Sequence, residues 1–272
     1  MNDEKQARLH AHLHMLGKVV VAFSGGVDST FLLQSACDAL GKEAVIAVTG
    51  CSLSFPQREV QAAQTFTRER QITHFLVDAE ELAIDGFADN PPNRCYLCKH
   101  ALFDKIRALA DEKKVAHIVE ASNVDDEGDY RPGLAALDEL HIISPLRKAR
   151  LTKADIRALS KAMGLPTWNK PSFACLASRF PYGERIDAKR LQQIDSAEQF
   201  LLSAGFRQVR VRLHEGGKLA RIELDEEGFA LLSSAALRQQ ISEHFKELGF
   251  TYTALDLLGY RTGSMNEILW VR

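Results

Sequence analysis

Apolar and polar positions follow two patterns along the first two-thirds of the chain. Short continuous apolar runs predict buried strands, and longer runs with apolar residues every three or four positions predict helices. Strands are expected at 18–23, 44–48, 72–77 and 115–120, and helices at 29–40, 57–70, 99–112, 134–140 and 152–163. Apolar strands that alternate with amphipathic helices are typical of a parallel sheet covered on both faces. The expected fold class is therefore α/β, with a doubly wound parallel sheet.

The pattern changes after residue 183. A helix is expected at 188–203, then a hairpin over 209–224, a single helix near 228–248 and a strand at 251–255. In the first hairpin strand Arg210, Arg212 and His214 alternate with apolar residues, which predicts one basic face. These basic residues either bind an anionic substrate or pair across the hairpin with Glu223 and Asp225. We predict two domains, a larger one at 1–183 and a small α-β-β-α-β domain at 184–272.

A glycine-rich loop connects the first predicted strand to the first helix. It reads Ser24-Gly25-Gly26-Val27-Asp28-Ser29. Adjacent glycines allow the backbone to approach an anion closely, and the helix directs its positive end toward the loop. The expected guest is a phosphate chain, although neither a Walker A lysine nor a G-x-G-x-x-G fingerprint is present. Asp28 is expected to help place Mg²⁺, which favours one or two carboxylates together with phosphate oxygens.

Composition narrows the class of protein. The chain has 272 residues, a formal net charge of −2 and 46% hydrophobic residues, which is ordinary for a globular protein. This balance predicts no partner among nucleic acids or anionic membranes. No signal peptide or apolar run of membrane-spanning length is visible, and five cysteines do not suggest a disulfide scaffold. We therefore expect a cytoplasmic protein.

Three cysteines stand in contexts that suggest chemistry. Cys95 and Cys98 are three residues apart near a predicted helix start, a position that lowers the pKa of a thiol. Cys175 lies in the segment Lys170-Pro171-Ser172-Phe173-Ala174-Cys175-Leu176-Ala177-Ser178-Arg179. A redox dithiol, half of a zinc site and three ligands of a [4Fe–4S] cluster all fit this spacing, which does not decide among them.

Several longer motifs carry a family resemblance. The glycine-rich loop resembles the PP-loop of the ATP pyrophosphatase superfamily. With it stand Ala121–Gly133, Ser144-Pro145-Leu146, Lys153 with Ile156-Arg157, Trp168–Ser172, Cys175–Gly183 and Leu258–Asn266. Together they resemble the LarE family of ATP-dependent sulfur transferases, which make the thiocarboxylates of a nickel-pincer nucleotide. The resemblance covers nearly the whole chain.

The resemblance implies a two-step reaction with ATP and Mg²⁺. A carboxylate of a pyridinium dicarboxylate mononucleotide is adenylated with release of pyrophosphate, and sulfur then displaces AMP. In sacrificial members the cysteine that matches Cys175 gives up its own sulfur. The additional pair Cys95 and Cys98 resembles members whose three cysteines carry a [4Fe–4S] cluster that binds an extra sulfide. For this chain the resemblance therefore favours a cluster, with zinc second.

Further residues are candidates for binding the ligand, and other functions are also considered. Asn123, Asp125, Asp126 and Glu127 follow the fourth predicted strand, at the edge where ligands of parallel sheets bind. Arg210, Arg212 and Arg261 are candidate anion contacts, and a homo-oligomer is expected. The alternatives are a tRNA-thiolating PP-loop enzyme, an amidating ligase of the NAD or GMP synthetase kind, and a non-catalytic nucleotide-binding protein.

Overall fold

Two compact units make up the chain. The computed structural model describes residues 2–126 and 133–267. The first unit contains residues 1–84 and 93–173, and the second contains residues 85–92 and 174–272. The units divide earlier in the chain than residue 183, and residues 85–92 belong with the second unit. The existence of two separately folding domains stays a prediction.

The first unit is built on a parallel sheet of four strands in the order β3-β2-β1-β4. The predicted doubly wound parallel sheet is therefore confirmed. Valines alternate between the two faces of β1, and all three are fully buried, which explains the continuous apolar run in the sequence. The strands are β1 (Val19–Ala22), β2 (Val45–Cys51), β3 (Thr73–Asp78) and β4 (His117–Val119).

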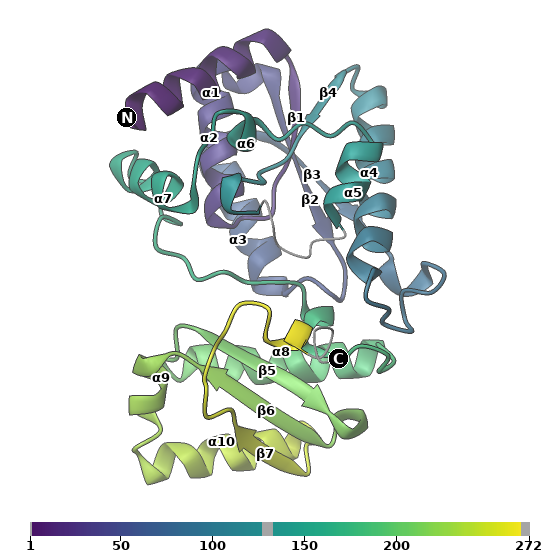
Figure 1. The fold of residues 1–272 in the computed structure, drawn as a ribbon, viewed down its shortest axis with the longest axis vertical. Helices are drawn as coiled ribbons and strands as arrows, with labels where there is room; N and C mark the ends of the chain where they lie inside the picture. Colours follow the sequence, from purple (N-terminus) through teal and green to yellow (C-terminus); the bar gives the residue numbers. More distant parts are fainter. Residues whose placement is uncertain (1, 127–132, 268–272) are drawn as a thin grey trace. The chain divides into compact units, whose positions relative to one another are not determined.

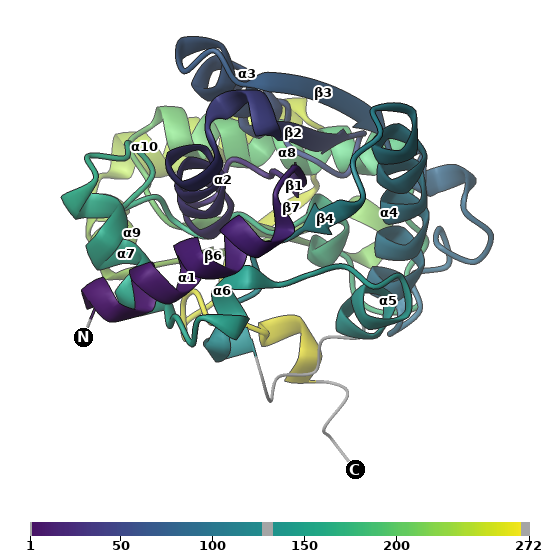
Figure 2. The same cartoon turned by 90° about the horizontal axis from the view of Figure 1, so that it is seen from above.

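Helices cover both faces of this sheet (Figures 1 and 2). One face packs against α1 (Asn2–Leu16), α2 (Val27–Leu40), α3 (Gln57–Glu69), α6 (Pro145–Lys148) and α7 (Lys153–Ala162). The other face packs against α4 (Arg94–Glu112) and α5 (Gly133–Glu139). The predicted start of α7 is confirmed, because Thr152 and Asp155 form a capping box.

The second unit contains a three-stranded sheet in the order β5-β6-β7. Strands β5 (Val209–His214) and β6 (Leu219–Leu224) form the predicted antiparallel hairpin, and β7 (Tyr252–Leu255) runs parallel to β6. Three helices complete the unit: α8 (Ala188–Ser203), α9 (Glu226–Leu231) and α10 (Ala235–Glu247). The expectation of a single helix near 228–248 was wrong, because Ser234 begins a new helix by accepting a hydrogen bond from the Leu237 amide.

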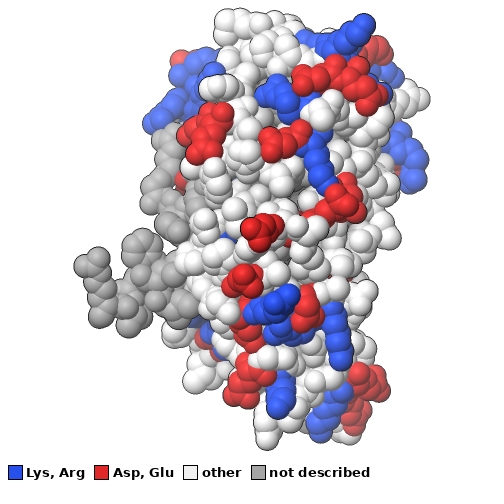
Figure 3. Space-filling view, turned by 90° about the vertical axis from the view of Figure 1, so that its right-hand side faces the viewer, with Lys and Arg blue, Asp and Glu red and all other residues white. Residues whose placement is uncertain are grey.

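Six short 3₁₀ segments lie between these elements in the described residues: Lys42–Ala44, Glu81–Ala83, Val124–Asp126, Leu176–Arg179, Glu215–Gly217 and Ser264–Asn266. Among the described helices, none is both long and apolar enough to cross a membrane. On the face drawn in Figure 3, acidic and basic side chains are interspersed rather than gathered by sign.

Candidate functional site

The glycine-rich loop lies at the carboxyl end of β1 and leads into α2. Gly25 has φ +70°, a left-handed conformation that side chains disfavour, and a Cβ there would stand 3.4 Å from Ala63 Cβ. Within the loop the Ser24 amide donates to Ser29 Oγ (3.3 Å), and Ser29 Oγ donates to the Gly26 carbonyl (3.3 Å). The loop is therefore preformed at the amino end of a helix, where backbone amides favour an anion.

Side chains of neighbouring elements hold the segment that leads into this loop. Thr49 Oγ1 on β2 donates to the Phe23 carbonyl (2.6 Å) and contacts His74 Nε2 (2.8 Å), while His74 Nδ1 contacts Thr67 Oγ1 (3.0 Å). Burial lowers the pKa of His74, which favours the neutral ring. The His74 ring therefore links β2 to α3 through Thr49 and Thr67.

A small hollow opens beside the loop at the ends of β1 and β2. Its volume is about 100 Å³. Its lining is mostly apolar and includes Phe23, Val48, Phe55, Val60, Leu102 and Ile106, together with the polar residues Ser24 and Glu59. An apolar slot next to an anion-binding loop suits a flat ring attached to a phosphate.

Two lysines of the first unit reach the loop. Lys153 Nζ donates to Asp28 Oδ2 (2.6 Å), and Lys170 Nζ donates to the Gly25 carbonyl (3.0 Å) and to Glu59 Oε2 (2.6 Å). The other carboxylate oxygen of Asp28, Oδ1, is buried and has no hydrogen-bond partner among the described residues. A half-satisfied carboxylate on the first turn of α2 fits the expected place of Mg²⁺.

The loop that follows β4 was expected to contribute acidic ligands. Asn123 is buried, and its Oδ1 accepts from the Asp125 amide (2.9 Å), while its own amide donates to Asp126 Oδ2 (3.0 Å). Asp125 Oδ2 accepts from the Lys153 amide (2.6 Å), so this loop holds the start of α7. Glu127 and the rest of that motif lie outside the described residues.

Sequence reasoning missed Glu120, which directly follows β4 at the same edge. It is buried and accepts from Ser144 Oγ (2.5 Å) and from the Ser122 amide (3.0 Å) and hydroxyl (2.8 Å). A lone acidic residue directly after an apolar strand was the available signal. Lys153 also received no role, although the motif that contains it was noted.

The three candidate cysteines fall in different units. Helix α4 begins earlier than predicted, so Cys95 and Cys98 lie within its first two turns, in the first unit. Cys175 belongs to the second unit and begins the 3₁₀ turn at Leu176–Arg179. No group of three or more Cys, His, Asp or Glu residues that could hold a metal ion occurs in the described parts of the chain. The structure therefore gives no support to a [4Fe–4S] cluster.

The two remaining cysteines, Cys37 and Cys51, have thiols with raised pKa values. Burial, with smaller contributions from Asp38 and Glu43, raises the pKa of Cys37 to about 11. Burial, with Asp78 and Glu81, also raises the pKa of Cys51. Both thiols are therefore poor nucleophiles at neutral pH.

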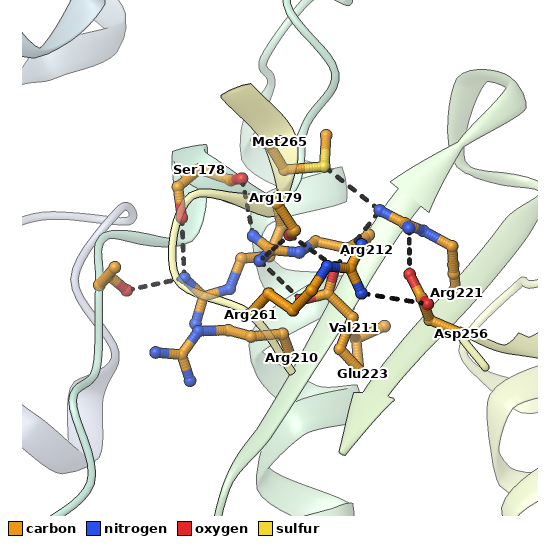
Figure 4. Close-up of polar contacts among 12 residues, drawn as sticks. Ser178, Arg179, Arg210, Val211, Arg212, Arg221, Glu223, Asp256, Arg261 and Met265 are labelled. Carbon is orange, nitrogen blue, oxygen red and sulfur yellow. Dashed lines mark hydrogen bonds and ion pairs between the residues drawn. The ribbon is translucent and has the colours of Figure 1, made fainter. Parts of the chain in front are cut away.

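The segment around Cys175 is held by Arg179, which pairs with a buried carboxylate and also donates to Ser178 Oγ (Figure 4). Arg179 and Glu198 are both fully buried, and the guanidinium donates to the carboxylate through Nε (2.8 Å) and Nη2 (2.9 Å). Arg179 Nη1 also donates to the carbonyls of Ala174 (3.0 Å) and Cys175 (3.2 Å). Burial alone would raise the pKa of Glu198, but Arg179 holds it below its usual value.

Two of the three basic residues on the predicted face of β5, Arg210 and Arg212, are buried. Arg212 donates to Glu223 Oε2 (2.7 Å), which is the cross-hairpin pairing considered above, and also to the Ser178 carbonyl (3.1 Å). Asp225 does not take part, because it caps α9 instead. Arg210 lies over the Tyr260 ring (5.0 Å to its centroid). Burial and then the charge of Arg179 lower the pKa of Arg210 to about 10.

Arg261, the third candidate anion contact, already has acidic partners. Its guanidinium lies 3.4 Å from Asp256 Oδ1 and 3.1 Å from Glu267 Oε1. Hydrogen bonding to Glu267 raises the pKa of Arg261. An anionic ligand would have to compete with these carboxylates, and the roles of all three arginines in binding stay predictions.

Comparison with known proteins identifies the family of this chain. The family model described as NAD synthase matches residues 7–191, so the chain belongs to that family. An uncharacterised protein of Synechocystis is 39% identical over 99% of both chains. The pyridinium-3,5-bisthiocarboxylic acid mononucleotide synthase of Lactiplantibacillus plantarum is 37% identical over 97% of this chain and 95% of its own. The chain belongs to the LarE family.

Membership of the LarE family confirms the resemblance found in the motifs. The chain is an ATP-using enzyme, and its similarity to the L. plantarum synthase fits ATP-dependent sulfur transfer. A tRNA-specific 2-thiouridylase of Leptospira interrogans is more distant, with 26% identity over 65% of this chain and 57% of its own. In this LarE-family enzyme the PP-loop lies at the carboxyl end of β1, and its role as the nucleotide site stays a prediction.

Proposed function

We propose that this enzyme adenylates a carboxylate of a pyridinium mononucleotide and then converts it to a thiocarboxylate. The observation that carries the proposal is the preformed loop Ser24–Ser29 with the half-satisfied Asp28, in a chain 37% identical to a synthase whose name states such a product. A loop without the Walker lysine favours cleavage between the α and β phosphates, as in the PP-loop superfamily that it resembles.

The first step joins the substrate to AMP. A carboxylate oxygen attacks the α-phosphorus, the bond from that phosphorus to the bridging oxygen breaks, and pyrophosphate leaves with the electron pair. The backbone of Gly25, Gly26 and Val27 and the hydroxyls of Ser24 and Ser29 bind the phosphates. Asp28 would hold Mg²⁺, which neutralises phosphate charge when bound. Support for this role is the buried Oδ1 without a partner.

The second step brings sulfur to the activated carbonyl carbon, and AMP leaves. In the sacrificial route the nucleophile is Cys175 Sγ. The Cβ–Sγ bond then breaks, the Cα proton goes to a base, and dehydroalanine and a thiocarboxylate remain. Arg179 supports this assignment because it fixes the backbone carbonyl of Cys175 (3.2 Å). A sulfide on a [4Fe–4S] cluster of Cys95, Cys98 and Cys175 is the alternative source, supported by the sequence alone.

The substrate carries a phosphate and carboxylates, and arginines of the second unit would bind these anionic groups. Arg210, Arg212 and Arg261 are the candidates, and Asn123 is assigned to the nucleotide. A cytoplasmic location and a homo-oligomeric state complete the proposal.

Product analysis tests the first step. The wild-type enzyme with ATP, Mg²⁺ and substrate should release AMP and pyrophosphate. Asp28→Asn should lower that rate by about 100-fold, because it removes the carboxylate that would hold the cation. Asp38→Asn, on the same helix but exposed, serves as the matched control and should leave the rate unchanged. ADP and inorganic phosphate as products would refute the proposal.

A second experiment distinguishes the sulfur sources. Cys175→Ala should still release pyrophosphate but form no thiocarboxylate. In the sacrificial route mass spectrometry after one turnover finds the chain lighter by one H₂S, and Cys95→Ala remains active. In the cluster route an oxygen-free preparation contains about four irons per chain, and Cys95→Ala loses them. Thiocarboxylate formation by Cys175→Ala would contradict both routes.

A further inference from the structure

Lys170 holds the backbone of the glycine-rich loop together with an acidic residue of α3. Its ammonium donates to the Gly25 carbonyl (3.0 Å) and to Glu59 Oε2 (2.6 Å). The side chains of Lys170 and Glu59 are only 18% and 15% exposed, so salt screens this pair less than a surface pair. Hydrogen bonds that involve charged groups are also stronger than those between neutral groups. The Gly25 carbonyl is therefore bonded to a donor that is itself fixed.

The backbone that carries Lys170 is anchored within the first unit. Arg157 of α7 donates through Nη1 to the Trp168 carbonyl (2.9 Å) and through Nη2 to the Lys170 carbonyl (3.0 Å). The Lys170 amide donates to the Thr167 carbonyl (2.9 Å). Glu59 lies in the first turn of α3, where the helix dipole favours an acidic side chain. Both members of the Lys170–Glu59 pair thus extend from ordered backbone.

The carbonyl that Lys170 bonds belongs to a peptide group with two accessible orientations. This group joins Gly25 to Gly26, and because neither residue has a Cβ, it can rotate at little steric cost. No described peptide bond is cis, and in a planar trans peptide the C=O and the N–H point in opposite directions. The Gly26 N–H therefore points away from Lys170. In the rotated orientation a carbonyl oxygen would replace this N–H, and a carbonyl oxygen repels a phosphate.

We infer that Lys170 and Glu59 are positioning residues that keep the Gly25–Gly26 peptide with its N–H toward a bound phosphate. Lys170 stays on the Gly25 carbonyl and does not contact the nucleotide. Glu59 neutralises the ammonium and keeps it at the carbonyl. The inference rests on the part of the proposed function that places phosphates at the loop.

Calorimetric titration with pyrophosphate and Mg²⁺ tests the pair in the full chain. Lys170→Met should bind pyrophosphate about tenfold more weakly than wild type, because apparent affinity falls with the fraction of chains in the binding orientation. Glu59→Leu should bind it about threefold more weakly, since the ammonium loses the partner that fixes it. The controls are Lys42→Met and Glu69→Gln, at exposed positions of the same unit, and both should bind like wild type.

The sign of the Glu59→Leu effect separates positioning from direct contact. If Lys170 bound the phosphate itself, Glu59→Leu would free the ammonium and remove a nearby negative charge, so binding would tighten. The double variant Lys170→Met with Glu59→Leu keeps the net charge of the pair. It should be as weak as Lys170→Met alone, because both changes release the same peptide group. Tighter binding in Glu59→Leu, or wild-type affinity in Lys170→Met or in the double variant, would overturn the inference.

Turnover supplies a readout that a general loss of structure would not give. Lys170→Met should raise the KM for ATP about tenfold and leave the kcat for pyrophosphate release within about twofold of wild type. Lys170→Arg should recover most of the affinity, because a guanidinium can also donate to the carbonyl and the carboxylate. A lower kcat with an unchanged KM would overturn the inference, as would a wild type that does not bind pyrophosphate. If the affinities follow the expected pattern but wild type releases no pyrophosphate from ATP, the proposed function fails and the inference stands.

Discussion

Removing the carboxylate of Glu198 should strongly destabilise the second unit. Glu198 and Arg179 are fully buried, and the carboxylate accepts hydrogen bonds from Nε and Nη2 of Arg179 and from the Val211 amide (3.0 Å). In Glu198→Ala the guanidinium stays charged, because arginine does not deprotonate in proteins. Breaking one partner of a buried pair costs about 3–5 kcal/mol. We expect a loss at the upper end, because the nearby charge of Arg210 also loses its counterion.

Hydrogen–deuterium exchange of the β5 peptide measures this loss, because the Val211 amide is itself a donor to Glu198. A loss of about 5 kcal/mol corresponds to a roughly 4,000-fold faster exchange when exchange follows the opening equilibrium. Glu227→Ala is the control, since this exposed carboxylate lies 3.8 Å from Arg207 and should contribute less than about 1 kcal/mol. The double variant Arg179→Met with Glu198→Leu should recover most of the stability. A loss below about 1 kcal/mol in Glu198→Ala would refute the reasoning.

Two further predictions concern the first unit. Gly25→Ala should raise the KM for ATP about tenfold with little effect on a thermal melt, because a Cβ disfavours the φ of +70° that the phosphate loop requires; a KM like that of wild type would contradict this. Burial would raise the pKa of Asp155, but bonds from Lys5 and Thr152 hold that pKa at about 2, below its usual value. This stabilisation should be complete above about pH 4 and lost as the pH falls toward 2, so Asp155→Asn should show a flatter dependence of Tm on pH over that range.

The sequence predicted the helices and strands of the first unit well because both faces of its sheet are covered. A buried parallel strand must be apolar at every position, so its run of valines is visible without any structure. The helix α1 was nevertheless missed, although Leu9, Leu13 and Leu16 have helical spacing and Gly17 follows them. The break between α9 and α10 was missed because its cap, Ser234, resembles any surface serine.

Side-chain roles in the site were predicted less well than their positions. The phosphate loop was found because its glycines and hydroxyls are local features of the sequence. The pairing of Lys153 with Asp28 joins residues 125 positions apart, and that of Arg179 with Glu198 joins different elements. Alternation in β5 predicted a basic face but not its burial, because the pattern does not reveal which other elements pack on that face.

By itself the sequence determined the parallel sheet, the phosphate loop at its edge and the family, since these depend on local residue order and on apolar periodicity. Tertiary structure alone decided which charges neutralise one another. It pairs one oxygen of Asp28 with Lys153 and leaves the other without a partner in the described residues, and it buries Arg179 against Glu198 next to the Cys175 segment. The physical reason is that electrostatic partners are chosen by distance and burial in the folded chain, and neither quantity is encoded by neighbouring residues.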